Sequence, residues 1–400
     1  MARKSQAIRG DESLESQLKN FANAHLSRRA LLAGAGGAGL VGATSLMASG
    51  GISQADAAVQ SVRWANWGLY LDFDNKTKTY PTLEAFKKKS GIKATYQEAV
   101  DDNDSFTAKV SPQLRLKKDI GYDAVVLTEW MVARWLASGF AQKFDDNNLP
   151  NKKNVIPSQL HRSFDDGRHY SLPWAGVIAG MAWNKKFLPK GLNTLDQLFS
   201  KTNKGRIEVL SEMRDTIGLV MLWQGTDIAK PFTEAKFMNA VDYVSKMVKD
   251  GIIRQIKGQS YSEDLISGDA IAVIGWSGDI NQLNLQNNNQ FGFAIPESGG
   301  TFTTDNWMIP ATSPNKLNAE KLINYYYDPV VAAKVANYIN YICPVAGAQE
   351  AMAKINPAQA KNTLIFPDAK MWSKLHAFRE LNPSESLKFS TAFQKASGKG

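Results

Sequence analysis

Acidic and aromatic side chains recur in this 400-residue sequence at the points where short apolar segments end. Aromatic faces attract methylene groups and ammonium charge, and carboxylates hold ammonium ends through charge-assisted hydrogen bonds. The combination therefore suits an extended organic ammonium ion. The five segment ends are Asn66-Trp67-Gly68-Leu69-Tyr70, Thr128-Glu129-Trp130, Ser211-Glu212-Met213-Arg214-Asp215, Gly275-Trp276-Ser277-Gly278-Asp279 and Thr304-Asp305-Asn306.

Each of these residues also has a purely structural explanation. A tryptophan at the end of a strand commonly packs in a core, and acids such as Glu212 and Asp215 are favoured at a helix start by the helix dipole. Asp279 and Asp305 can cap turns. Only the whole set, repeated at comparable positions, indicates a binding site.

The hydrophobic pattern of the sequence predicts the helices and strands that must position these residues. Short apolar runs alternate with helical patterns, which predicts an α/β fold. Ligands of open α/β sheets bind beyond the carboxyl ends of the strands, where the five segment ends fall. The predicted strands are 62–66, 92–96, 122–127, 205–210 and 270–276, and the predicted helices are 82–89, 129–138, 213–223, 237–248 and 329–337.

Length and composition exclude several classes of protein. A chain of 400 residues exceeds what one core normally organises, and 44% hydrophobic with 21% charged residues is an ordinary globular balance. One cysteine, Cys343, beside four histidines excludes a disulfide scaffold and a zinc module, so we expect no metal and no cofactor. The net charge of +9 is scattered in small lysine clusters, which predicts no nucleic-acid partner.

The first 57 residues have the layout of an export signal. Arg28-Arg29 precede an uncharged stretch, 30–48, and Ala55-Asp56-Ala57 offers a cleavage site. The arginine pair resembles that of a bacterial twin-arginine signal, which implies the twin-arginine translocase as export partner and a periplasmic or extracytoplasmic location. A retained membrane anchor is the alternative, although the glycines in 30–48 make a poor span.

From Val62 to Pro367 the sequence resembles the periplasmic spermidine/putrescine-binding proteins of bacterial ABC uptake systems. The resemblance depends on the order and spacing of short motifs. They are Asn66-Trp67-x-x-Tyr70, Leu83-Glu84-x-Phe86, Gly91-Ile92-Lys93, Tyr122-Asp123-x-Val125-Val126, Tyr170-Ser171-x-Pro173-Trp174, Arg214-Asp215, Gly275-Trp276-Ser277-Gly278, Ile309-Pro310 and Leu322-Ile323-Asn324.

The resemblance implies a two-lobed α/β periplasmic binding protein fold of type II, with the ligand in the cleft between the lobes. Lobe 1 would comprise 58–175 and 304–346, and lobe 2 would comprise 176–303 and 347–400, with crossings near Ala175, Thr303 and Ala346. The lobes would close on the ligand by a hinge motion. The implied partners are a polyamine and the permease subunits of an ABC transporter, and the implied state is a monomer.

The resemblance also assigns roles at the site. Trp67, Tyr70, Trp130, Trp276 and Tyr341 would line the aliphatic chain of the ligand, with Thr128 hydrogen-bonding near one end. Glu212, Asp215 and Asp305 would hold the amines, with Asp279 as a supplementary anion. Thr303 stands where the family has an aromatic residue, and Trp130 replaces a typical tyrosine. We also expect mutual repulsion to raise the pKa values of the converging carboxylates.

Three alternatives compete with a polyamine. A quaternary ammonium held in an aromatic cage needs fewer acids, and ferric iron held by tyrosinates is suggested by Tyr325-Tyr326-Tyr327. A secreted hydrolase would use two carboxylates. Against an enzyme, Gly275-Trp276-Ser277-Gly278-Asp279 lacks the final glycine of a nucleophile elbow, and the four histidines form no motif. We therefore predict a binding protein and not an enzyme.

Overall fold

The computed structural model describes residues 60–398, and the predicted export signal, 1–57, lies outside this range. Within 60–398, no helix is both long enough and apolar enough to cross a membrane. The strands are β1 (Ser61–Trp67), β2 (Lys93–Val100), β3 (Ala124–Thr128), β4 (Ser171–Asn184), β5 (Ile207–Leu210), β6 (Ile253–Lys257), β7 (Ala272–Trp276), β8 (Phe291–Ala294), β9 (Gly300–Met308) and β10 (Leu375–Ala377).

Helices flank these strands along the described chain. The α-helices are α2 (Pro81–Ser90), α3 (Asn103–Arg115), α4 (Glu129–Ala137), α5 (Leu195–Leu198), α6 (Met213–Trp223), α7 (Glu234–Lys249), α8 (Tyr261–Ser267), α9 (Ser277–Gln286), α10 (Lys316–Tyr326), α11 (Pro329–Ile339), α12 (Ala348–Ile355), α13 (Pro357–Ala360), α14 (Ala369–Trp372) and α15 (Pro383–Ala396). Short 3-10 helices are η1 (Asp146–Asn148), η2 (Pro150–Asn154), η3 (Pro157–Gln159) and η4 (Lys201–Asn203).

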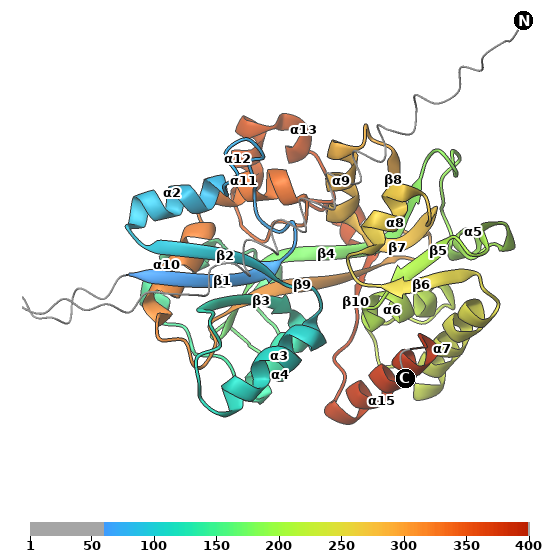
Figure 1. Ribbon diagram of the computed structural model, residues 1–400, viewed down its shortest axis with the longest axis horizontal. Coiled ribbons are helices and arrows are strands. Elements are labelled where there is room, and N and C mark those ends of the chain that lie inside the picture. The colour runs from blue at the N-terminus through green and yellow to red at the C-terminus, as the bar shows by residue number, and fades with distance from the viewer. Residues whose placement is uncertain (1–59, 399–400) are drawn as a thin grey trace, which may run out of the picture. The chain divides into compact units, whose positions relative to one another are not determined.

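One sheet runs through the described residues in the order β2-β1-β3-β9-β4-β7-β5-β6, with β10 paired to β9 and β8 paired to β4. β1, β2 and β3 are parallel, as are β5, β6 and β7. The long strands β9 and β4 join these sets through antiparallel pairs, as Figure 1 shows. Because three antiparallel steps separate β3 from β7, the two parallel sets run in opposite directions.

The register makes the carboxyl ends of the two parallel sets face each other. Thr128, at the end of β3, pairs with Asp305 of β9, which pairs with Ala175 of β4. Trp276, at the end of β7, pairs with Ala179 of β4. The two ends are therefore four residues apart along β4, or roughly 13 Å at the usual rise of a strand. The sheet thus places both sets of strand ends around one short central stretch.

Separate hydrophobic cores give the protein two lobes, as the sequence predicted. In the first lobe, alternate residues of β1 face opposite sides: Trp64 packs in a core with residues of α2 and α10, and Ala65 packs in a core with residues of α3 and α4. Figure 1 shows α2 on one side of the sheet and α3 and α4 on the other. The second lobe is built on β5, β6 and β7 with α6 and α7, where Phe237 stacks on Phe389 at 3.8 Å. Met352 of α12 packs in the first core.

The predicted elements match the structure where the local signals are strong. Asp328 caps α11 through hydrogen bonds to the backbone of Val330 and Val331, as its place before a proline indicated. Two differences matter for the site. β2 continues to Val100, beyond its predicted end at Tyr96, and the unpredicted helix α3 follows with Asp102 as its cap.

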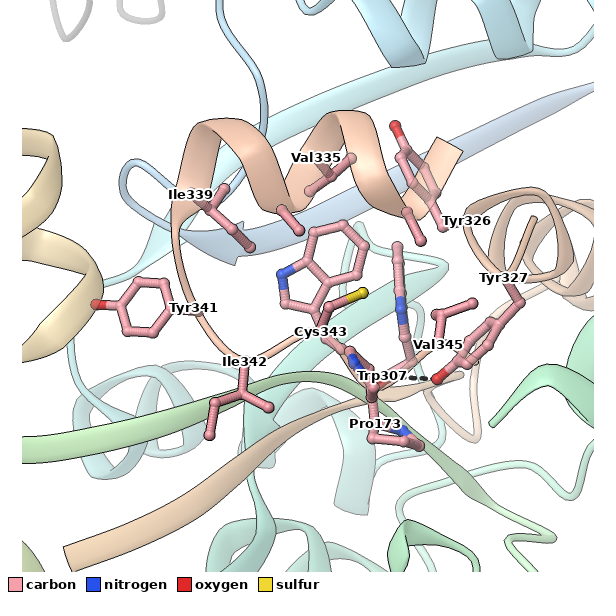
Figure 2. Close-up of a pocket in the computed structure, with 14 residues that line it drawn as sticks. Pro173, Trp307, Tyr326, Tyr327, Val335, Ile339, Tyr341, Ile342, Cys343 and Val345 are labelled. Atoms are coloured by element: carbon pink, nitrogen blue, oxygen red, sulfur yellow. Dashed lines mark hydrogen bonds between the residues drawn. The ribbon is translucent and has the colours of Figure 1, made fainter. Parts of the chain in front are cut away.

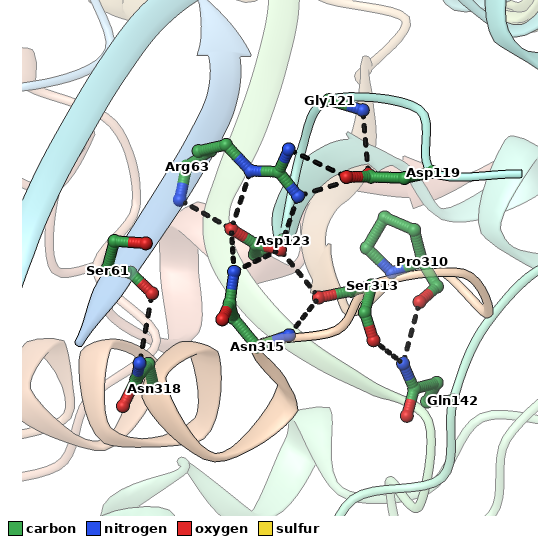
Figure 3. A network of polar contacts seen from close by, with 10 residues as sticks. All are labelled: Ser61, Arg63, Asp119, Gly121, Asp123, Gln142, Pro310, Ser313, Asn315 and Asn318. Carbon is green, nitrogen blue, oxygen red and sulfur yellow. Dashed lines mark hydrogen bonds and ion pairs between the residues drawn. The ribbon is translucent and has the colours of Figure 1, made fainter. Parts of the chain in front are cut away.

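A polar network fixes the amino-terminal ends of β1 and β3 (Figure 3). The Arg63 guanidinium contacts Asp123 at 2.8 Å and Asp119 at 2.8 Å, and Ser313 Oγ donates to Asp123 at 2.8 Å. These contacts hold the pKa of the buried Asp123 carboxyl below its usual value, although burial opposes them. The network therefore joins these two parallel strands at the ends that lie away from the cleft.

Candidate functional site

A cleft opens where the two sets of strand ends meet. It contains about 570 Å³ of unfilled space, part of it open to solvent. Eight of the ten predicted ligand-contacting residues line it, whereas Trp130 and Asp279 do not. The lining residues are Trp67, Tyr70, Asp101, Asp102, Asn103, Thr128, Val177, Ser211, Glu212, Asp215, Gly258, Gln259, Trp276, Thr303, Asp305 and Tyr341.

Asp305 lies on β9 opposite the end of β3. Its carboxylate accepts hydrogen bonds from Tyr70 Oη and Thr128 Oγ1, both at 2.7 Å, and the residue is 5% exposed. Burial raises the pKa of Asp305 to about 6, although these two hydrogen bonds oppose the shift. Within residues 60–398 no arginine, lysine or histidine forms an ion pair with it. Among the described residues, Asp305 is therefore a buried acid without a counter-cation.

Asp215 repeats this arrangement from the other lobe, in the first turn of α6. Its carboxylate accepts hydrogen bonds from Thr301 Oγ1 at 2.7 Å and from Trp276 Nε1 at 2.8 Å, and burial raises its pKa. The residue is 3% exposed and has no ion-pair partner in the described part of the chain. The bond to Trp276 also fixes the plane of that indole at the cleft.

Glu212 caps α6, accepting a hydrogen bond from the Arg214 backbone N–H at 3.3 Å. Burial raises its pKa to about 8; the nearby Arg214 opposes the shift, and Asp215 and Asp102 add to it. The predicted repulsion between carboxylates is thus present but secondary, because desolvation is the largest cause for Glu212, Asp215 and Asp305 alike.

Aromatic rings form the walls of the cleft. Trp67 ends β1 and Trp276 ends β7, so one comes from each lobe. Tyr70 contacts Tyr341 edge to face, with ring centroids 4.9 Å apart. These rings offer faces and edges for an aliphatic chain between the acids.

The two predicted residues that do not line the cleft contact residues that do. Trp130 Nε1 donates to Glu212 Oε2 at 3.3 Å. Asp279 is 2% exposed and accepts hydrogen bonds from Tyr341 Oη at 2.6 Å and Tyr261 Oη at 3.0 Å. Gly278 permits this arrangement, since a Cβ there would lie 2.3 Å from the Tyr341 ring. Asp279 therefore orients a wall of the cleft.

Several residues that line the cleft were not predicted from the sequence. Asp101 and Asp102 follow β2, so they obey the rule of acids at strand ends, but the predicted strand stopped at Tyr96 and hid them. Gln259 follows β6, and its Nε2 donates to the backbone oxygen of Gly68 at 3.3 Å across the cleft. No pattern in the sequence marks Gln259 or Val177.

A second, smaller cavity lies inside the first lobe and shares Tyr341 with the cleft (Figure 2). Its lining is apolar and aromatic, and burial raises the pKa of the Cys343 thiol in it to about 12. Tyr327 Oη donates to the Pro173 backbone oxygen, and Tyr326 is buried in the first core. These two tyrosines thus pack in the lobe and do not line the cleft. Among residues 60–398, no cluster of three or more His, Cys, Asp or Glu side chains is arranged to hold a metal.

Two α/β lobes with a cleft lined by acids and aromatic rings define a two-lobed solute-binding protein. The model of the bacterial extracellular solute-binding protein family matches residues 82–364, more than half of the chain, so the chain belongs to that family. The relatives below are likewise solute-binding proteins rather than enzymes.

Two curated relatives come from Escherichia coli K12. The spermidine/putrescine-binding periplasmic protein is 27% identical over 304 residues, covering 75% of this chain and 84% of that protein. The putrescine-binding periplasmic protein PotF is 25% identical over 337 residues, covering 80% and 86%. Among solved structures, a putative spermidine/putrescine ABC transporter from Listeria monocytogenes superposes with a TM-score of 0.72 at 24% identity, covering 84% of this chain and 98% of that one. The last comparison supports the two-lobed fold.

Proposed function

We propose that this protein binds a linear polyamine, putrescine or spermidine, in the cleft between its lobes and delivers it to the permease of an ABC importer. One observation carries the proposal: Asp215 and Asp305 are buried carboxylates at the cleft with no cationic partner in the described residues. An ionised carboxylate taken out of water is costly unless it is paired. A ligand ammonium would supply the pairing charge.

The spacing of the two acids favours a linear ligand. Asp215 accepts a hydrogen bond from Thr301 of β9. Asp305 lies four residues after Thr301, on the same face of β9. Thr301 and Asp305 are thus roughly 13 Å apart along the strand, so the two acids reach the cleft at different points along β9. A diamine or triamine places ammonium groups at both, whereas a compact quaternary ammonium pairs with one acid and leaves the other unpaired.

The names of the relatives support the same ligand class, since the two E. coli proteins are named for spermidine and putrescine. By the same likeness we assign this protein to the periplasm or the outer face of the cell membrane, as a monomer that is not an enzyme. We assign its export to the twin-arginine translocase through residues 1–57.

The assignment of site residues remains part of the proposal. Trp67, Tyr70, Trp276 and Tyr341 surround the aliphatic chain, Thr128 supports one end, and the amines are held by Glu212, Asp215 and Asp305. The lobe boundaries that the resemblance implies are 58–175 with 304–346, and 176–303 with 347–400. The packing of Met352 and Ile365 in the first core favours placing the last crossing after Ile365 rather than at Ala346.

Calorimetric titration of the purified protein tests the proposal. We expect heats of binding with putrescine or spermidine and weaker or no heats with betaine and ferric citrate. Asp305→Asn should weaken binding, while Glu320→Gln, which alters a buried hydrogen-bonded carboxylate of α10 outside the cleft lining, should leave it unchanged. No response of the wild-type protein to either polyamine would exclude this function.

A further inference from the structure

β3 and β5 both end at the cleft, and the helices that follow them, α4 and α6, contact each other across it. Trp130 stands in the first turn of α4 and packs against the core of the first lobe. Glu212 caps α6, whose first residue, Met213, packs in the core of the second lobe. The hydrogen bond from Trp130 Nε1 to Glu212 Oε2, at 3.3 Å, therefore joins the two lobes.

A second contact joins the same residues. The Arg214 guanidinium of the second lobe lies 4.5 Å from the centroid of the Trp130 ring, and Arg134 of α4 itself lies 5.1 Å from it. Arg214 Nη1 is also 3.9 Å from Glu212 Oε1. The Trp130 indole thus contacts a cation with its ring and an acid with its N–H, both from the opposite lobe. Residues 129–131 and 212–214 form a patch that we call the α4–α6 contact.

Glu212 belongs to both the cleft and the α4–α6 contact. It lines the cleft, where a ligand ammonium would reach it, and it accepts the Trp130 N–H. An ammonium beside Glu212 keeps that carboxylate ionised, and an ionised acceptor forms a stronger hydrogen bond than a protonated one. A ligand ammonium at Glu212 would therefore strengthen this contact between the lobes.

We propose that Trp130 is a positioning residue that couples ligand binding to lobe closure: its indole N–H holds the ligand-facing carboxylate of Glu212 only when the lobes are closed. This rests on the proposed function, because the ligand must be a cation. Two further bonds between the lobes, from Gln259 to the Gly68 oxygen and from Gln282 to the Leu69 oxygen, join uncharged groups and do not respond to ligand charge in this way.

The test compares two identical substitutions. Trp130→Phe keeps an aromatic ring but removes the N–H that reaches Glu212. Trp223→Phe is the matched control, because Trp223 Nε1 donates to Asp196 at 2.9 Å within the second lobe, away from the cleft lining. We expect Trp130→Phe to weaken spermidine binding by about three- to tenfold, mainly through faster dissociation, the size expected for one hydrogen bond. Trp223→Phe should bind as the wild type does.

Lobe closure is measured separately, by electron spin resonance distances between labels at the exposed positions Ala108 of α3 and Lys236 of α7. Singly labelled proteins control for reaction at the buried Cys343. Spermidine should shift the wild-type and Trp223→Phe distances to one closed population, and Trp130→Phe should keep an open fraction at saturating ligand. In a Glu212→Gln background, Trp130→Phe should cost much less affinity, because the charge that links the two residues is gone.

The outcomes separate the two proposals. If wild-type protein binds and closes on spermidine, and Trp130→Phe does the same with equal affinity, the coupling role is wrong and polyamine binding stands. If the wild type binds no polyamine, the proposed function fails, and the coupling role fails with it. Thermal unfolding checks that Trp130→Phe folds, and Trp130→Tyr serves as a second variant without the indole N–H.

Discussion

Polyamine binding should strengthen as the pH rises from 7 to 8.5, because Glu212 must lose a proton to pair with an ammonium. Burial raises the pKa of Glu212 to about 8, so only about a tenth of the free protein carries this charge at pH 7. An ammonium bound beside it lowers that pKa. Binding at pH 7 should therefore release close to one proton from Glu212.

The magnitude follows from the fraction of ionised Glu212. Raising the pH from 7 to 8.5 increases that fraction about eightfold, which corresponds to about 1.2 kcal/mol of binding free energy. Below pH 6 the slope should steepen, because the pKa of Asp305 is raised to about 6 and this acid also begins to gain a proton. The decline in affinity at lower pH therefore has two stages.

Calorimetry in buffers of different ionisation enthalpy measures the released protons directly. Glu212→Gln should flatten the affinity between pH 7 and 8.5, and Glu263→Gln, which changes an exposed glutamate of α8 outside the cleft lining, should not. An affinity that is constant across this range, with heats independent of the buffer, would refute the assignment of Glu212 to the ligand.

The same shift predicts the stability of the ligand-free protein. Because the folded-state pKa of Glu212 is raised from 4.5 to about 8, the folded state holds this proton while the unfolded state releases it. The free energy of unfolding should therefore fall as the pH rises from about 4.5 to about 8, and Glu212→Gln should remove that part of the decline. Chemical denaturation at several pH values measures it, and a decline of the same size in the variant would contradict the reasoning.

Further predictions concern single side chains. Asp305→Asn should cost about 1.5–3 kcal/mol of polyamine binding by removing one charge-assisted contact, and calorimetry showing unchanged affinity would remove it from the site. Gly278→Ala should reduce both thermal stability and ligand affinity, because the added Cβ meets the Tyr341 ring; a variant that matches the wild type in both would mean that the ring moves freely. Asp123→Ala should lower the free energy of unfolding by about 3–5 kcal/mol, since it leaves Arg63 without its buried partner, and denaturant titration with a loss below about 1 kcal/mol would show that Asp119 suffices.

Local signals in the sequence determined much of the fold. The cap at Asp328 and the helix over 213–223 depend on residues within one or two turns of each other, so their pattern is readable from the chain alone. The carboxyl ends of β1, β3 and β7 were also marked by their aromatic and acidic residues. The helix α3, which has Pro112 in its interior, was not predicted, and β2 was predicted to end at Tyr96, where the polar Gln97 and Glu98 follow.

The order and spacing of the short motifs resemble those of a known family. This resemblance indicated the family and its cleft from the sequence alone. Eight of the ten chosen residues line that cleft, since β9 and β4 bring the carboxyl ends of the two parallel sets together. Thr128 and Asp305, which are 177 residues apart, hydrogen-bond because the antiparallel pairing of β3 and β9 places them opposite each other.

Only the tertiary structure decided what Trp130 and Asp279 contact. Both were chosen for the cleft because their chemistry suits a ligand, yet Trp130 bonds to Glu212 of the other lobe and Asp279 holds the Tyr341 hydroxyl. Some side chains contact the ligand, and others support the side chains that do. Packing between segments far apart in the chain, over a few ångströms, decides which role a side chain has. The sequence specifies which groups are available, and the meeting of the two lobes decides which of them are exposed to the cleft.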